Sequence, residues 1–253
     1  MKKVLGVILL SCIACSRVPD AVEETEVLAP TAVTSADDNL IVLDHSLAQH
    51  HLSIIRNKDT KPSEFRASIK KIAELLVVTA TKNLPTADVA VETPVAKTIC
   101  RRIDPRRKIF VVPILRAGLG ISCVAEDMIP DANIQLLGMY RDEKTHNPVW
   151  YYNKLPATFS DTSNITVFIC DPMLATGGSA YETIKLYLGK GILEKNITFL
   201  SVISAPEGVK RLREAFPEIR IITASLDQKL NERAYIVPGL GDAGDRFFNF
   251  TAK

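Results

Sequence analysis

The chain has 253 residues, of which 47% are hydrophobic and 24% are charged, and its formal net charge is +2. This composition is that of a globular protein with a sizeable core, and the small net charge argues against a general nucleic-acid binder or an acidic solvating tail. The five cysteines are an odd, widely spaced set, which argues against a disulfide framework or a zinc site.

The N-terminal segment resembles an export signal. Lys2 and Lys3 precede an apolar run over residues 4–10, and the sequence LLSC that ends at Cys12 resembles a bacterial lipoprotein cleavage site. A wrongly assigned start codon or an extension without a role also explains it. Residues 16–39 are rich in Pro, Thr, Ala, Glu and Asp and predict a disordered linker. We therefore expect a signal-like segment over 1–15, a linker over 16–39 and a folded domain over 40–253.

The apolar pattern of the remaining chain predicts alternating helices and strands. Phe65, Ile69 and Ile72 fall on one face of a helix predicted over 62–83. Residues 89–103 are assigned only loosely, with Arg101 and Arg102 expected on a solvated face. Strands are predicted over 109–115, 134–140, 165–170, 197–203 and 219–224. Helices are predicted over 180–188 and 206–216, and another helical stretch ends near residue 128. This alternation predicts a central parallel sheet flanked by helices, the α/β class.

Two segments fall outside this alternation. Residues 144–156 suit an extended arm or a hairpin, in which Tyr151 and Tyr152 are expected to make packing or dimer contacts rather than to stack on a ligand. Residues 226–253 contain the glycine-rich sequence YIVPGLGDAGDRFF. A glycine-rich segment so late in the chain is either a tail or a ligand-facing loop.

The stretch ITVFICDPMLATGGSAYETIKLYL, residues 165–188, reads as strand, loop and helix. Two adjacent glycines, with Thr176 and Ser179, open the helix, and such a helix N-terminus is an anion site whose usual occupant is phosphate. An ordinary turn with a helix cap explains the same residues. Asp171 lies at the carboxyl end of the strand, where ligands bind in open parallel sheets.

Two further strand ends carry arginines. Arg116 follows the strand over 109–115, and Arg141 follows the strand over 134–140. Guanidinium groups bind phosphate bidentately, so these loops and the glycine loop predict a site for more than one phosphate. Asp171 would then hold sugar hydroxyls or a hydrated Mg²⁺ ion. The alternatives are a solvated loop residue for Arg116 and a surface ion pair for Arg141.

The chain also resembles a known family. DPMLATGGS, from Asp171 to Ser179, resembles the 5-phosphoribosyl-1-diphosphate (PRPP) loop of the type I phosphoribosyltransferases, in the form found in the uracil phosphoribosyltransferases. VPILRAGLG from Val112, GMYRDE from Gly138 and YIVPGLGDAGD from Tyr235 resemble segments of that family in the same order. The resemblance extends from about residue 44 to the C-terminus. It implies a type I phosphoribosyltransferase-like fold with a glycine-rich, base-binding C-terminal segment.

The resemblance implies that the protein converts uracil and PRPP to UMP and pyrophosphate, with Mg²⁺ on the diphosphate. Arg116, Asp171 and Asp242 would be catalytic, although an Asp in a Gly-Asp turn such as Asp242 is commonly structural. The implied PRPP-binding residues are Arg116, Arg141, Asp171, Pro172, Met173, Leu174, Ala175, Thr176, Gly177, Gly178, Ser179 and Asp242. The implied uracil-binding residues are Ile236, Gly241, Asp242 and Ala243.

Other consequences of the resemblance leave alternatives open. Pro172 stands where many relatives in the wider superfamily carry a second acid, so ligation of the metal by protein carboxylates is left unassigned. The family implies a homodimer or homotetramer and allows GTP as an effector, and no nucleic acid is expected as a partner. PRPP is a cytoplasmic metabolite, which predicts a cytoplasmic enzyme and conflicts with an export signal. A non-catalytic pyrimidine or PRPP sensor and an envelope-attached binding module are the competing interpretations.

Overall fold

A computed structural model describes residues 39–141 and 148–250. The predicted signal-like segment and, apart from Asn39, the predicted linker lie outside the described residues, so both stay predictions. Within the described part of the chain, no helix is both long and apolar enough to cross a membrane.

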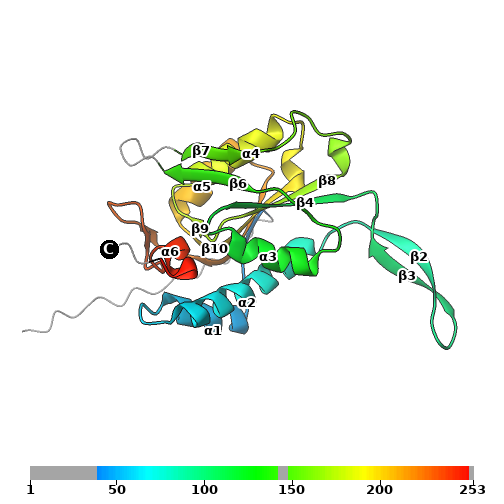
Figure 1. The fold of residues 1–253 in the computed structure, drawn as a ribbon, viewed down its shortest axis with the longest axis horizontal. Helices are drawn as coiled ribbons and strands as arrows, with labels where there is room; N and C mark the ends of the chain where they lie inside the picture. The colour runs from blue at the N-terminus through cyan, green and yellow to red at the C-terminus, as the bar shows by residue number, and fades with distance from the viewer. Residues whose placement is uncertain (1–38, 142–147, 251–253) are drawn as a thin grey trace, which may run out of the picture.

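The described strands and helices account for most of the folded domain (Figure 1). The strands are β1 (Leu40–Val42), β2 (Thr86–Glu92), β3 (Lys97–Ile103), β4 (Lys108–Leu115), β5 (Asn133–Ile134), β6 (Leu137–Arg141), β7 (Pro148–Asn153), β8 (Ile165–Cys170), β9 (Met173–Leu174), β10 (Ile197–Ser204), β11 (Arg220–Leu226), β12 (Lys229–Leu230) and β13 (Ile236–Val237). The helices are α1 (Ser46–Arg56), α2 (Pro62–Thr81), α3 (Leu119–Met128), α4 (Gly178–Leu188), α5 (Pro206–Ala215) and α6 (Ala243–Phe248).

The centre of the fold is a nine-stranded sheet whose path runs β1–β11–β10–β8–β4–β6–β7, with β5 beside β4 and β9 beside β10. Its strand pairs are parallel except β6 with β7, which form an antiparallel edge. The predicted α/β class with a central, mostly parallel sheet flanked by helices is therefore confirmed. In a parallel sheet the carboxyl ends of the strands meet at one edge, and this arrangement positions the site.

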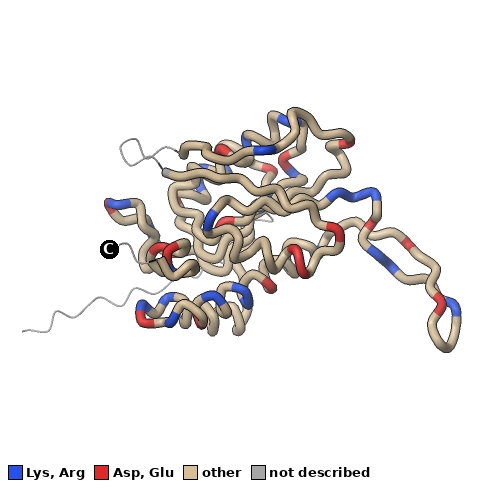
Figure 2. Tube along the Cα trace, viewed as in Figure 1, with Lys and Arg blue, Asp and Glu red and all other residues tan. Residues whose placement is uncertain are grey.

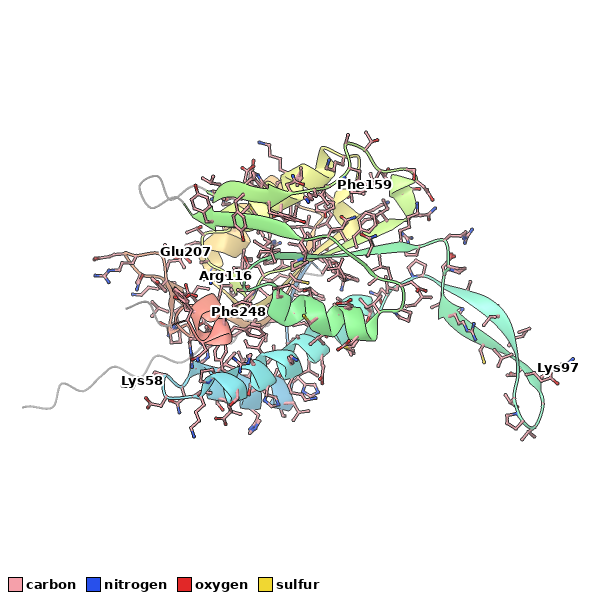
Figure 3. The ribbon with its side chains drawn as sticks, in the orientation of Figure 1. Lys58, Lys97, Arg116, Phe159, Glu207 and Phe248 are labelled. Carbon is pink, nitrogen blue, oxygen red and sulfur yellow. The ribbon has the colours of Figure 1, made fainter. Side chains whose placement is uncertain are left out.

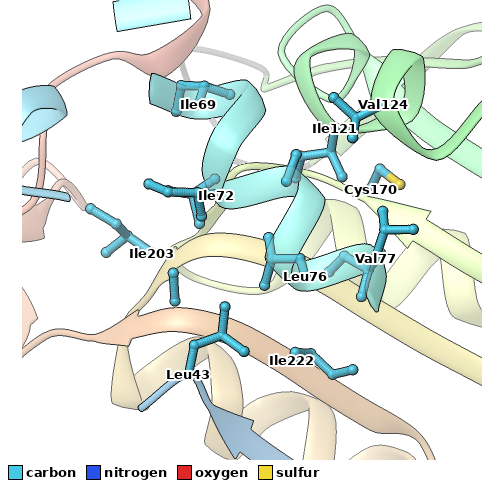
Figure 4. Close-up of a cluster of buried hydrophobic side chains, with 14 of the residues drawn as sticks. Leu43, Ile69, Ile72, Leu76, Val77, Ile121, Val124, Cys170, Ile203 and Ile222 are labelled. Atoms are coloured by element: carbon cyan, nitrogen blue, oxygen red, sulfur yellow. The ribbon is translucent and has the colours of Figure 1, made fainter. Parts of the chain in front are cut away.

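Helices cover both faces of the sheet (Figure 1). Phe168 of β8 packs with α1, α2 and α3, whereas its neighbour Ile169 packs with α4 and α5 on the opposite face, because successive strand residues point to opposite sides. Figure 4 shows the first of these cores, where Leu76 and Ile72 of α2 belong to the same cluster as Ile203 of β10. Full burial of one such side chain stabilises the fold by about 1.5–3 kcal/mol.

The predicted elements agree with the structure except in a few places. The strand predicted over 134–140 is divided into β5 and β6, although both parts pair with β4 in the same register and the N–H of Gln135 bonds to Val111 O. The Gln135 side chain accepts a 2.6 Å hydrogen bond from the Tyr187 hydroxyl. Residues 89–103 form most of the hairpin β2–β3, in which Arg101 and Arg102 are exposed as predicted. The predicted arm contributes β7, which pairs with β6.

The hairpin β2–β3 projects from the sheet (Figure 1) and pairs along its whole length, from Thr86 opposite Ile103 to Glu92 opposite Lys97. Acidic and basic residues are interspersed along the described chain rather than gathered into one stretch (Figure 2). This distribution means that any binding of an anionic ligand depends on local geometry rather than on overall charge.

Candidate functional site

A pocket of about 650 Å³ lies at the carboxyl edge of the sheet. It is bounded by residues that follow β4, by β6, β7 and β9, and by the glycine-rich segment near the C-terminus. Its lining residues are Leu115, Arg116, Ala117, Met139, Tyr140, Tyr151, Met173, Ala175, Arg233, Ala234, Tyr235, Ile236, Gly241, Asp242, Ala243 and Gly244. The glycine-rich segment is therefore a wall of a pocket and not a tail.

The glycine loop leads from β9 into α4. Gly177 is the N-cap of α4 and has φ +74°, a left-handed conformation that favours glycine. Gly178 has no positive φ, and a Cβ there would meet atoms only at ordinary contact distances of 3.6 Å or more. The backbone therefore needs the first glycine of the pair for its conformation. No side chain caps the first turn of α4, and its N–H groups are the ones predicted to bind an anion.

The first turn of α5 supports this loop from behind, a contact that no sequence motif predicted. A Cβ on Gly208 would lie 2.4 Å from Ala175 O, and a Cβ on Gly177 would lie 3.2 Å from Gly208 O. The Arg211 guanidinium donates to Thr176 O at 3.4 Å and lies 5.1 Å from the Tyr181 ring. The two backbones approach so closely that Gly208 must lack a side chain.

Arg116 follows β4 and has an exposed side chain that lines the pocket. Its Nη2 lies 3.4 Å from Asp245 Oδ1, and its guanidinium carbon lies 5.9 Å from the ring centre of Phe248 (Figure 3). These contacts are made to α6, the helix that closes the glycine-rich segment. An exposed ion pair at this distance contributes about 0–1 kcal/mol, so little energy opposes a move of the guanidinium toward an anionic ligand.

Asp171 follows β8 and is held by the backbone around it. Its N–H donates to Leu200 O at 3.1 Å, and its Oδ1 accepts from the Met173 N–H at 3.3 Å. Burial raises the pKa of the Asp171 carboxyl to about 7; the Met173 hydrogen bond opposes this rise, and the negative charge of Asp242 adds to it. Asp171 is not one of the residues that line the pocket, but the Coulomb effect means that it lies near enough to Asp242 for the two charges to interact.

The glycine-rich segment brings its four predicted uracil-binding residues together. Ile236, Gly241, Asp242 and Ala243 all line the pocket, and Gly241 has φ +80°. Asp242 is exposed and is also the N-cap of α6, because its Oδ1 accepts from the Asp245 N–H at 2.8 Å. The structural role considered for this residue therefore exists, and one of its carboxylate oxygens is committed to it.

Most of the predicted PRPP-binding residues lie on or beside the pocket. Arg116, Met173, Ala175 and Asp242 line it, and the residues from Thr176 to Ser179 continue from Ala175 into α4. Pro172 and Leu174 are buried, and Leu174 belongs to the core beside α4 and α5. Neither residue lines the pocket, and the carbonyl oxygens of both accept hydrogen bonds from residues 202–205. The Arg141 side chain lies outside what the structure describes, so its role stays a prediction.

Several pocket residues were not assigned to the site from the sequence. Met139 and Tyr140 come from β6, and Tyr151, which was expected to make packing or dimer contacts, comes from β7. The rings of Tyr140 and Tyr151 are 6.5 Å apart. Alternation along the strands does not group these residues, because Met139 and Tyr140 are consecutive and the pairing of β6 with β7 shifts register between Gly138 and Met139. A hairpin was one of the two interpretations of residues 144–156, but its register, which brings these side chains to the pocket, was not predicted.

The described residues hold no group of three or more His, Cys, Asp or Glu side chains arranged to bind a metal ion. The chemistry of the pocket is nevertheless compatible with Mg²⁺ carried by a ligand. Mg²⁺ retains several waters and commonly binds through one or two carboxylates together with phosphate oxygens. Asp171 and Asp242 are the carboxylates that would meet such an ion.

A parallel sheet whose carboxyl edge carries a glycine loop, an arginine and two carboxylates is typical of the α/β proteins that bind their ligands at this edge. The sequence matches the profile of the uracil phosphoribosyltransferase family over residues 42–250, and the chain belongs to this family.

Similar proteins support the same assignment. Uracil phosphoribosyltransferase from Limosilactobacillus fermentum is 49% identical over 207 residues, which cover 82% of this chain and 96% of that protein. The enzyme of the same name from Pediococcus pentosaceus is 50% identical with the same coverage. A solved structure from Aquifex aeolicus is 34% identical, covers 85% of this chain and 100% of its own, and superposes with a TM-score of 0.76. The similarity thus extends over most of this chain and nearly the whole length of these proteins.

Proposed function

We propose that the protein is a pentosyltransferase that converts uracil and PRPP to UMP and pyrophosphate. The observation that carries this proposal is a pocket that joins the glycine loop, Arg116 and the glycine-rich segment. These two substrates together require a phosphate site, a cation for a second anionic group and a small apolar compartment. The family relationship supports the same reaction.

The glycine loop would bind the 5-phosphate of PRPP through the N–H groups of the first turn of α4. Asp171, at the end of β8, would accept hydrogen bonds from the ribose hydroxyls. A carboxylate accepts such bonds most strongly when it is ionised, and hydrogen bonds to a charged group contribute about 1.5–3 kcal/mol each. The backbone bonds that fix Asp171 would keep its carboxylate oriented before the substrate arrives.

The diphosphate would lie toward Arg116 and Arg141. During the reaction the bond between C1 of the ribose and the diphosphate oxygen breaks, and the electron pair leaves with pyrophosphate. Arginine side chains stabilise this departing charge electrostatically. Mg²⁺ bound to the diphosphate would supply further neutralisation of the leaving group, with Asp171 and Asp242 facing its hydration shell.

Uracil would be held by backbone groups of the glycine-rich segment at Ile236 and from Gly241 to Ala243. Its N1 forms the new bond to C1 of the ribose and loses its proton. Positioning of N1 in line with C1 is the main requirement of this step. Asp242 is the carboxylate nearest to the uracil segment, and it would receive the N1 proton if a general base operates.

A direct assay tests the proposed reaction. The full-length protein is incubated with uracil, PRPP and Mg²⁺, and UMP and pyrophosphate are measured together. We expect equal amounts of both products with uracil, and none with hypoxanthine, orotate or cytosine. Binding of PRPP without product from any of these bases would contradict the proposal and would favour the non-catalytic sensor.

Two substitutions separate the capping role of Asp242 from its charge. Asp242→Asn retains a good N-cap, whereas Asp242→Ala removes it and should destabilise the protein by about 1 kcal/mol. If the charge acts in catalysis, both variants should lower kcat about tenfold, and loss of the charge should also lower the pKa of Asp171. Steady-state kinetics and thermal unfolding measure the two effects. An Asp242→Asn variant with unchanged kcat would restrict this residue to capping.

The remaining expectations concern partners and location. We propose a homodimer or homotetramer, supported by the projecting hairpin β2–β3, in which Val95 and Ile99 are 94% and 65% exposed. Sedimentation of the full-length protein measures the assembly.

GTP as an effector stays a prediction to which no residue is assigned. A cytoplasmic location is proposed because the proposed substrate PRPP is made there.

A further inference from the structure

Asp227 is a buried carboxylate outside the pocket. It follows β11 and is 0% exposed. Arg56, the last residue of α1, donates to its Oδ1 at 2.6 Å and to its Oδ2 at 2.8 Å, so the ion pair is bidentate. Ser225 Oγ donates to Oδ1 at 2.8 Å, and the Gly239 N–H donates to Oδ2 at 2.8 Å. Four hydrogen bonds therefore hold a charge that makes no contact with the proposed reaction.

These bonds hold the turn that begins the uracil-binding segment. Gly239 has φ +64°, and a Cβ there would lie 2.1 Å from Ile236 O. The Gly239 N–H donates to Asp227, and the Gly239 carbonyl oxygen accepts from Arg56 Nη1 at 2.8 Å. Both polar groups of this residue are therefore occupied by one ion pair. The turn places Ile236 on one side and Gly241 on the other, and both line the pocket.

A second arginine fixes the other end of the same segment to the same helix. Arg246 of α6 donates to Leu240 O at 2.7 Å, to Asn57 O at 2.7 Å and to Ile55 O. Its guanidinium carbon also lies 4.4 Å from the ring centre of Phe65. The end of α1 therefore serves as a platform to which residues 239–246 are attached through two guanidinium groups.

We propose that the Arg56–Asp227 pair is a positioning device that sets the geometry of the uracil-binding segment. It touches neither substrate and acts through Gly239. The inference rests on the proposed function for the identity of the base. The phosphate loop is supported separately by α5, and Asp242 is the one residue of this segment assigned to PRPP. A disturbance of this pair should therefore affect binding of the base much more than binding of PRPP.

The test is Arg56→Lys in the full-length protein. Lysine keeps the positive charge but cannot reach both carboxylate oxygens and Gly239 O together, because it lacks the planar fork of arginine. We expect the KM for uracil to rise about tenfold and the KM for PRPP to change less than twofold. Hydrogen exchange of backbone amides over residues 236–244 should accelerate, while exchange over residues 171–179 should stay the same.

The matched control is Arg106→Lys. Arg106 also forms a bidentate pair, with Nη2 2.6 Å from Asp104 Oδ2 and Nε 3.0 Å from Oδ1, but it lies at the base of the hairpin β2–β3. This control should leave both KM values and exchange over 236–244 unchanged. If Arg56→Lys fails to fold, Asp227→Asn, which removes the charge at constant shape, is measured in the same way.

The outcomes are distinguishable. An unchanged KM for uracil, or equal increases in the KM values of both substrates, would overturn the positioning role. Unchanged exchange over 236–244 would overturn it independently of any activity. A wild-type protein that makes no UMP would instead contradict the proposed function, and the exchange experiment would still decide whether the pair fixes this segment.

Discussion

Asp171→Asn is expected to lower kcat/KM for PRPP about a hundredfold. The substitution keeps the shape of the side chain and removes the charge that would accept hydrogen bonds from the ribose hydroxyls. Two such bonds are worth about 3 kcal/mol, and each 1.4 kcal/mol is a factor of ten. Steady-state kinetics with PRPP as the varied substrate measure this loss. Kinetics equal to those of the wild type would mean that Asp171 does not contact the sugar.

The pH dependence provides a sharper test of Asp171. Its pKa is raised to about 7, so in the free protein the carboxyl is mostly neutral below pH 7 and ionised above it. The profile of kcat/KM reports the free enzyme, and for the wild type it should rise up to tenfold per pH unit below 7 and level off above it. The Asp171→Asn variant should lack this rise below pH 7. Its profile should show only the pH dependence that the ionisation of PRPP itself produces with both proteins.

The same carboxyl should affect stability in the opposite sense. Its folded pKa of about 7 lies above the ordinary value of 3.8, so the folded state binds more protons between these values. The free energy of unfolding contributed by this group is highest below about pH 4 and falls as the pH rises through 7. Asp171→Asn removes this loss, so its melting temperature should exceed that of the wild type more at pH 8 than at pH 5. A difference that does not depend on pH would contradict the raised pKa.

Gly118→Ala is expected to destabilise the protein by about 3 kcal/mol and to disable the site. A Cβ at this position would lie 2.3 Å from Cys170 O, 2.7 Å from Ile114 N and 2.8 Å from Ile114 O. All three atoms belong to the backbones of β4 and β8, so no side chain can turn away to make room. The start of α3 must move, and with it Arg116 moves relative to Asp171.

Thermal unfolding and kinetics measure the two effects of Gly118→Ala. A loss of this size corresponds to a melting temperature lower by about 6–12 °C. The control is Gly189→Ala, at φ −61°, where a Cβ would lie 3.3 Å from its nearest neighbour, Lys185 O, and which should change stability by less than about 1 kcal/mol. A Gly118→Ala protein as stable and as active as the control would show that the two strands tolerate a wider separation.

Some features of the fold depend on contacts that no local pattern contains. Gln135 lies within an apolar run that reads as one strand, and no local signal marks the interruption between β5 and β6 that the structure shows there. The helix α1 was not assigned from the sequence, although its last residue, Arg56, holds Asp227 from 171 positions away. No sequence motif marks Gly208. It must be a glycine only because the loop at Ala175 lies against it.

The sequence by itself determined the α/β class, the long strands of the central sheet, four of the six described α-helices, and the segments that form the site. Continuous β-branched runs and glycine loops are local signals, and the order of four motifs along the chain is enough to indicate the family. Only the tertiary structure decided that these segments share one pocket, that Asp171 lies where burial and Asp242 raise its pKa, and that Arg56 bonds to Gly239 in the glycine-rich segment. Burial and charge interactions depend on distances between residues far apart in the chain, and folding alone sets those distances.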